Sequence, residues 1–492
     1  RDRKYLTAID SIWQNIMQKK FYITGGIGST SNGEAFGEDY ELPNMTAYCE
    51  TCAAIANVFF NHRLFLLHGQ GKYIDAMERT LYNGVLSGVS LDGGSFFYPN
   101  PLESVGQHQR QPWFGCACCP SNISRFIPSI PGYIYAVRDN DLYFNLYVSN
   151  TTALKVAGRD VEVEQVTDYP YNGTVKVFLR KARGPVNLKF RIPGWLRNEV
   201  VPSSDLYEYS DGKRLQFTVK INDKVVEAKV DDNGYINIDR DWIANDKIEL
   251  IMDMEPRIVK ADARVEADRG RVAVERGPLV YCAEFADNVG FDIRSILLNQ
   301  NPKFVLGEKH ILDKYKVNTL ATDAQVLIFN SRGELQSRSV ELDLIPYFAW
   351  NHRGEGSMSV WMPQELSAAA PVKPATLASR STINASHKTN SISSLNDRII
   401  PKSSDDLNTP FFQWSTKGGM EFVEYTFPGS TQVQACTLYW YDDPRNGGKV
   451  PQSWRILYKT YDGSWRPVNG ADHYTVKKGT VRATLTGANE SR

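Results

Sequence analysis

The chain has 492 residues, with 56 Lys or Arg balanced by 56 Asp or Glu, so its formal net charge is zero. This balance gives no electrostatic reason to expect nucleic acid or an anionic membrane as a partner. The sequence has no apolar run of about 18 residues that would predict a membrane-spanning helix, and its length suits roughly three domains.

The first part of the chain is predicted to be helical. Apolar residues recur every three or four positions over 4–17, 51–67 and 72–86, which is typical of amphipathic helices. The residues expected to face the core from the second helix are Ala54, Ile55, Val58 and Phe59. The residues expected to face solvent on the third helix are the charged Asp75, Glu78 and Arg79. A further short helix is expected from about Ser121.

After Gly132 the apolar period changes to two, which predicts short β-strands. The clearest strands are 143–148, 173–179, 186–192, 246–251, 421–427 and 435–441. Regular spacing of such strands favours two β-sandwiches within 135–364. The stretch 365–376 is rich in Ala, Pro and Ser and is interpreted as a linker. Residues 377–492 then form a separate β domain, whose pattern loosely resembles discoidin-like, galactose-binding β-sandwiches.

Two cysteine-rich stretches carry the chemistry. One is Phe114-Gly115-Cys116-Ala117-Cys118-Cys119-Pro120, and the other is Cys49-Glu50-Thr51-Cys52. Neighbouring thiols cannot all point into one core, so metal binding or nucleophilic catalysis is the better interpretation. Together the stretches offer thiolates and one carboxylate, which suit a tetrahedral Zn²⁺ site.

The spacing within the upstream stretch constrains its geometry. Residues two apart on a helix point about 200° apart, so Glu50 and Cys52 can share a metal only if a helix starts between them. Thr51 would then be the N-cap. Spacing alone leaves a closed structural zinc site open, built from Cys49, Cys52, Cys118 and Cys119.

The stretch from Tyr22 to Cys119 resembles the β-L-arabinofuranosidase group of glycoside hydrolases, family 127 and relatives such as family 146. The matching motifs are Tyr-Ile-Thr-Gly-Gly-Ile-Gly at 22–28, Gly33-Glu34-Ala35-Phe36, Asp39-Tyr40-Glu41-Leu42-Pro43-Asn44, Glu50-Thr51-Cys52 and Gly-Cys-Ala-Cys-Cys-Pro at 115–120. The likeness continues through Arg276-Gly277-Pro278-Leu279-Val280-Tyr281 to about Pro363.

The resemblance implies an (α/α)₆ barrel, whose second half is residues 1–134, followed by β-sandwich domains. It also implies a zinc ion held by Glu50, Cys52, Cys118 and Cys119. Cys118 would be the nucleophile and Glu34 the general acid/base, with Glu38 the second candidate acid. Tyr98 and Cys116 would line the sugar site. Retention of configuration through a thioglycosyl-cysteine intermediate follows from the same resemblance.

Elementary chemistry is consistent with this assignment. A free thiol has a pKa near 8.5 and is mostly protonated at neutral pH, whereas zinc ligation deprotonates it. A cysteine would thus replace the carboxylate nucleophile that is usual in retaining glycosidases.

The expected function is therefore a retaining, zinc-dependent glycoside hydrolase that removes terminal β-L-arabinofuranosyl residues from plant cell-wall glycans. One alternative is a relative that acts on another pectic furanoside such as aceric acid. Another is a non-catalytic carbohydrate-binding protein with a structural Cys-rich zinc site. Reversible thiol redox chemistry at Cys116 and Cys118 is a third idea. By analogy with glycan-degrading enzymes, the protein is expected to be exported to the periplasm or the extracellular space, with the first half of the barrel supplied by the same polypeptide.

Overall fold

The computed structural model describes residues 3–330, 332–387, 392–404, 406, 409–414, 419–429, 431–442, 448–468, 474–485 and 490–491. The chain divides into two compact units. The first unit comprises Arg1–Leu327 and Ser337–Ala370, and the second comprises Ile328–Gln336 and Pro371–Arg492. Pro371 lies inside the segment 365–376 interpreted as a linker. No helix in the described ranges is both long enough and apolar enough to cross a membrane.

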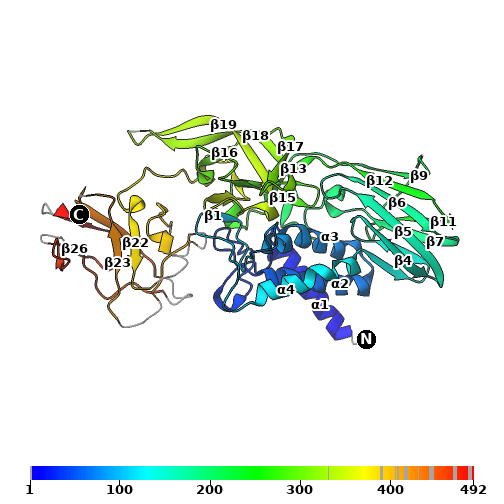
Figure 1. Ribbon diagram of the computed structural model, residues 1–492, viewed down its shortest axis with the longest axis horizontal. Coiled ribbons are helices and arrows are strands. Elements are labelled where there is room, and N and C mark those ends of the chain that lie inside the picture. The colour runs from blue at the N-terminus through cyan, green and yellow to red at the C-terminus, as the bar shows by residue number, and fades with distance from the viewer. Residues whose placement is uncertain are drawn as a thin grey trace. The chain divides into compact units, whose positions relative to one another are not determined.

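Four α-helices occur among the described residues, all in the first unit (Figure 1). They are α1 (Arg3–Lys19), α2 (Thr51–His68), α3 (Gly71–Arg79) and α4 (Cys118–Phe126). Helix α3 continues as a π-helical turn over Thr80–Val85 and a 3₁₀ turn over Leu86–Gly88, so the predicted third helix has its expected length. Helix α4 begins three residues before Ser121, which places two cysteines in its first turn.

The largest sheet of the first unit has eleven strands. Its main path runs in the order β16-β18-β19-β15-β14-β13-β8, and β1, β17, β20 and β21 pair beside this path. The strands are β1 (Glu103–Val105), β8 (Tyr207–Tyr209), β13 (Pro256–Ala261), β14 (Arg271–Arg276), β15 (Leu279–Glu284), β16 (Ile296–Leu298), β17 (Val305–Ile311), β18 (Tyr315–Phe329), β19 (Leu335–Pro346), β20 (Ser357–Ser359) and β21 (Met362–Pro363). This sheet shares one buried core with the helices.

A β-sandwich forms the rest of the first unit. A six-stranded sheet in the order β10-β9-β12-β6-β5-β4 and a four-stranded sheet in the order β11-β7-β3-β2 enclose a second core. The strands are β2 (Tyr135–Arg138), β3 (Asp141–Phe144), β4 (Asn150–Val156), β5 (Arg159–Thr167), β6 (Thr174–Lys181), β7 (Gly184–Arg191), β9 (Phe217–Ile221), β10 (Lys224–Val226), β11 (Tyr235–Trp242) and β12 (Lys247–Met252). Alternating apolar residues predicted four of these strands, β3, β6, β7 and β12, although the strand expected over 143–148 ends at Phe144.

The second unit contains antiparallel strand pairs. The pairs are β22 (Thr382–Ala385) with β23 (Val423–Thr426), β24 (Thr431–Gln432) with β29 (Glu490–Ser491), β25 (Ala435–Trp440) with β28 (Gly479–Thr484), and β26 (Leu457–Lys459) with β27 (Trp465–Pro467). The strands expected over 421–427 and 435–441 are therefore present. The likeness to discoidin-like sandwiches stays a prediction.

The helices expose part of their apolar surface. Tyr5 and Ile12 on α1 are 74% and 53% exposed, and Leu66 on α2 is 53% exposed. Phe59, which was expected to face the core, is 40% exposed on α2. The prediction for Phe59 was wrong, because its contact with Phe126 of α4, edge-on at 5.5 Å, covers only part of the ring.

The charged residues of α3 are buried, which corrects the prediction that they face solvent. Helix α3 lies between the sandwich and the eleven-stranded sheet, so arginine–carboxylate pairs replace water on its polar side. Arg191 at the end of β7 contacts Asp75 and Glu78, each at 2.5 Å, and its side chain is fully buried. Arg79 contacts Glu275 of β14 at 2.8 Å. These pairs fix the helices to both β regions.

Replacing Arg191 by Met should lower the free energy of unfolding by about 3–5 kcal/mol, because it leaves the buried carboxylate of Glu78 without a cation and removes one of the two arginines that pair with Asp75. Denaturant unfolding of the variant and the parent measures this loss. Lys155→Met is the matched control: Lys155 pairs with Asp160 at 3.0 Å on an exposed surface, so its loss should cost less than about 1 kcal/mol. Equal effects of the two substitutions would contradict the anchoring role of Arg191.

Candidate active site and metal centre

The start of α2 presents two of the predicted ligands. Glu50 occupies the N-cap position with extended backbone (φ −58°, ψ 139°), and Cys52 is the second helical residue. The expected helix start between them is therefore present. Thr51 is the first helical residue and not the N-cap, and its hydroxyl donates to the carbonyl oxygen of Phe97 at 2.9 Å. The break in helical geometry lets Glu50 and Cys52 face the same point.

The start of α4 presents the other two ligands. Cys118 and Cys119 are its first two residues, and Pro120 follows in the first turn, where a missing N–H leaves no hydrogen bond unmade. Cys119 is fully buried, whereas Cys118 is exposed. Adjacent cysteines thus differ in access to solvent while their sulfur atoms stay close together.

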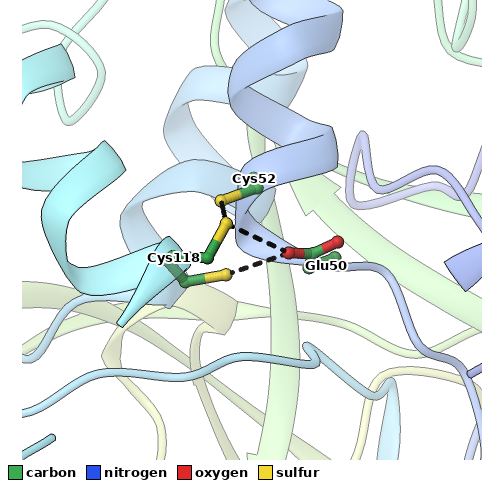
Figure 2. A group of neighbouring side chains, drawn as sticks. Glu50, Cys52 and Cys118 are labelled. Carbon is green, nitrogen blue, oxygen red and sulfur yellow. Dashed lines mark hydrogen bonds between the residues drawn. The ribbon is translucent and has the colours of Figure 1, made fainter. Parts of the chain in front are cut away.

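The four side chains converge (Figure 2). Their ligand atoms all lie within 4.8 Å of one another. The Sγ atoms of Cys52 and Cys118 are 3.0 Å apart, and the Sγ atoms of Cys119 and Cys118 lie 3.3 and 3.9 Å from Glu50 Oε1. Sulfur ligands around a tetrahedral zinc ion would be about 3.8 Å apart. The donor set therefore suits a metal ion, and the Cys52 and Cys118 sulfur atoms would lie about 0.8 Å farther apart around a tetrahedral zinc.

The ionisation of the four side chains is coupled. Burial raises the pKa of Glu50 to about 7. Hydrogen bonds from Cys119 and Cys118 lower the pKa of Cys52 to about 5, and the contact with Cys52 raises the pKa of Cys118 to about 11. The contact with Cys52 also raises the pKa of Cys119. The thiolate of Cys52 thus suppresses ionisation of the neighbouring thiols. A bound divalent cation would offset this effect by stabilising the negative charges.

Cys49 lies outside this cluster, so the site built from four cysteines does not form. Its thiol is 1% exposed and packs against Gly26, where an added Cβ would come within 2.9 Å of the sulfur. The donor set within the described ranges is instead three thiols and one carboxylate.

Glu34 lies beside the cluster on a short turn (Asn32–Glu34) and is exposed. The Tyr48 hydroxyl donates to Glu34 Oε1 at 2.9 Å, and the charge of Glu34 contributes to the raised pKa of Glu50. Burial and the Glu34 hydrogen bond raise the pKa of Tyr48, so the phenol stays protonated. Glu38 is also exposed, and its backbone N–H donates to Glu41 Oε2 at 2.9 Å. Of the two candidate acids, Glu34 is the one that Tyr48 contacts.

Tyr98 lies beside the cluster, and Cys116 precedes Cys118 by two residues in the chain. Tyr98 packs edge-on against Phe114 at 5.2 Å, and burial followed by its contact with Cys118 raises the pKa of its hydroxyl. Cys116 is exposed and is not among the converging ligand atoms. His108 stacks on Phe97 at 4.6 Å, and burial lowers its pKa to about 4. Within the described residues, no histidine joins the cluster.

Three successive parts of the chain match the domains of one known protein family. The catalytic domain of family 127 β-L-arabinofuranosidases matches residues 1–132, the middle domain of the same family matches 141–254, and its C-terminal domain matches 256–363. The chain belongs to glycoside hydrolase family 127. The site described above lies wholly within the part that matches the family's catalytic domain, and the three matches end before Pro371.

Individual family 127 proteins are similar over the same region. The non-reducing end β-L-arabinofuranosidase of Bifidobacterium longum is 32% identical over 388 residues, which are 73% of this chain and 56% of that protein. A solved family 127 β-arabinofuranosidase is 56% identical (TM-score 0.73), covering 75% of this chain and 57% of the other. A β-L-arabinofuranosidase from Geobacillus stearothermophilus T6 is 38% identical (TM-score 0.65), covering 72% and 56%. The chain thus spans slightly more than half the length of these relatives.

The four converging ligands should bind about one metal ion per chain, measurable by elemental analysis of purified protein. Cys119→Ala should reduce this content to a small fraction, because it removes one of four ligands. Cys49→Ala should retain the ion, since its sulfur lies outside the cluster. Loss of metal from Cys49→Ala with retention in Cys119→Ala would contradict the ligand set.

Proposed function

We propose that this chain carries the catalytic residues of a retaining glycoside hydrolase that removes terminal β-L-arabinofuranosyl residues from plant glycans. The observation that carries the proposal is the convergence of Glu50, Cys52, Cys118 and Cys119 beside Glu34 in a family 127 catalytic domain. Substrate class is inferred from the relatives, two of which are β-L-arabinofuranosidases.

The exposure of the three thiols supports different roles for them. Cys119 is buried and Cys52 is half-buried, so each suits a ligand that stays in place. Cys118 is the exposed thiol of the cluster, so a sugar carbon can reach its sulfur. We therefore assign Cys118 as the nucleophile. Zinc bound by Glu50 and the three cysteines would supply stabilisation of the thiolate form.

The reaction then has two steps with balanced protons. In the first, Cys118 Sγ attacks the anomeric carbon, the bond to the leaving oxygen breaks, and Glu34 gives that oxygen its proton. In the second, Glu34 takes a proton from water, the water oxygen attacks the anomeric carbon, and the carbon–sulfur bond breaks. Two displacements at one carbon retain its configuration. Tyr98 and Cys116 line the sugar site in this proposal.

The exposed apolar residues on α1 and α2 support a larger catalytic domain. The apolar side chains that α1 and α2 leave exposed to water are Tyr5, Ile12, Phe59 and Leu66. Exposed apolar surface of this kind often marks a contact with another part of a protein. We propose that helices from the same polypeptide cover it and complete an (α/α)₆ barrel, of which this chain supplies the second half. The relatives, which are nearly twice as long as the matched region, are consistent with this. Export to the periplasm or the extracellular space remains part of the proposal.

Two other functions are separable from this one. A family relative acting on another pectic furanoside, such as one of aceric acid, would use the same residues and differ in the sugar. A carbohydrate-binding protein with a structural zinc would need the cluster for folding and would not turn over any glycoside. Reversible oxidation of Cys116 and Cys118 would mark a redox role.

The test is turnover of an aryl β-L-arabinofuranoside by the complete polypeptide that carries this chain. Proton NMR at early times should show β-L-arabinose as the first product, which reports retention. Cys118→Ala should lower kcat at least ~10⁴-fold, and Glu34→Gln about 10²–10⁴-fold. Cys436→Ala, in the second unit, is the control and should leave kcat unchanged.

Retention of full activity by Cys118→Ala would contradict the assignment of the nucleophile. An inverted first product would contradict the two-step reaction. A folded, metal-loaded protein that hydrolyses no furanoside would favour the binding protein instead.

A further inference from the structure

The carboxylate of Glu34 has one side-chain hydrogen bond within the described part of the chain, and Tyr48 donates it to Oε1 at 2.9 Å. Glu34 otherwise projects from an exposed turn with φ of +50°, next to Gly33 with φ of +70°. A glutamate side chain in such a place is free to adopt several rotamers. The Tyr48 hydroxyl is therefore the contact that selects one of them.

The backbone ties Tyr48 to both halves of the site. Its N–H donates to the carbonyl oxygen of Ser29 at 3.3 Å, and the N–H of Cys49 donates to that of Gly28 at 2.8 Å. The Glu34 turn is closed by Thr30 and Ala35, which exchange backbone hydrogen bonds at 3.1 and 3.3 Å. Tyr48 thus lies two residues before the ligand Glu50 while its side chain holds the acid.

We propose that Tyr48 is a positioning residue that fixes the Glu34 carboxylate relative to the Cys118 sulfur. The inference rests on the proposed function and extends it. Retaining glycosidases need the acid/base and the nucleophile at a short, fixed separation across the anomeric carbon. Because Tyr48 occupies Oε1, the other oxygen of Glu34 is left to give and take the proton.

Tyr48 itself transfers no proton in this role. Its O–H donates to Oε1 when Glu34 is the acid in the first step and when it is the base in the second. The phenol therefore affects the rate through the orientation of Glu34. Its loss should lower the rate most for substrates whose leaving oxygen must be protonated. Misplacing a catalytic group by about 1 Å can cost about 10²-fold in rate.

Tyr48→Phe in the complete polypeptide tests the inference through the leaving group. For alkyl β-L-arabinofuranosides, whose leaving oxygen needs protonation, kcat/KM should fall about 10–100-fold. For a dinitrophenyl β-L-arabinofuranoside, which leaves without protonation, kcat/KM should change less than about 3-fold. Tyr135→Phe is the matched control, because its half-buried hydroxyl donates to Asn150 at 3.1 Å in the sandwich. It should change neither value.

A second measurement isolates the coupling to Glu34. In the Glu34→Gln background, adding Tyr48→Phe should change kcat/KM less than about 2-fold, because the group that Tyr48 positions is already disabled. Independent, multiplicative losses would overturn the inference. Equal losses on both leaving groups, or loss of bound metal from Tyr48→Phe, would also overturn it by assigning Tyr48 a purely structural role.

Different results would contradict the positioning role of Tyr48 and the proposed function. An active parent enzyme with an unaffected Tyr48→Phe variant overturns the positioning role alone. A metal-loaded parent that turns over neither class of furanoside overturns the proposed function, and with it the inference that rests on it.

Discussion

The site depends on the contact between the starts of α2 and α4, which lie far apart in the sequence. The segment at 97–100 holds the start of α2 in place. The N–H and hydroxyl of Thr51 donate to the carbonyl oxygens of Tyr98 and Phe97, at 3.0 and 2.9 Å. The buried amide of Asn100 donates to the carbonyl oxygen of Cys49 and to the Thr51 hydroxyl, at 2.9 and 3.0 Å. These hydrogen bonds satisfy backbone groups that a helix start leaves free, and they fix the direction in which Glu50 and Cys52 point.

Burial differs between adjacent residues of the cluster, which would let a metal ligand and an accessible thiol share one helical turn. Cys119 and Glu50 are buried, while Cys118, next to Cys119 in the first turn of α4, faces solvent. The contact with the Cys52 thiol and burial raise the pKa of Cys118, and a bound cation would lower it. In this arrangement the ionisation of Cys118 is coupled to that of the neighbouring side chains.

Periodicity is a local property, so it predicted the helices and the six strands that alternate most clearly, and the resemblance to a known family implied the four side chains that converge. The predictions failed where contacts between distant parts of the chain determine which side chains are buried. The charged residues of α3 were predicted to face solvent. They are buried because Arg191, more than a hundred residues later in the chain, pairs with Asp75 and Glu78. Cys49 belongs to the same motif as Cys52 but points into the core. Tyr48 gave no sequence signal, since a single tyrosine in a loop resembles any packed aromatic residue.

The central claim is that Cys118 forms a bond to the sugar. Incubation of the complete polypeptide with a slow aryl β-L-arabinofuranoside, followed by intact mass measurement and peptide mapping, tests it most directly. The account predicts a single pentosyl adduct on the peptide that carries Cys118, and no adduct in the Cys118→Ala variant. An adduct on Glu34 or on another residue, or turnover with no covalent adduct under any trapping condition, would contradict it.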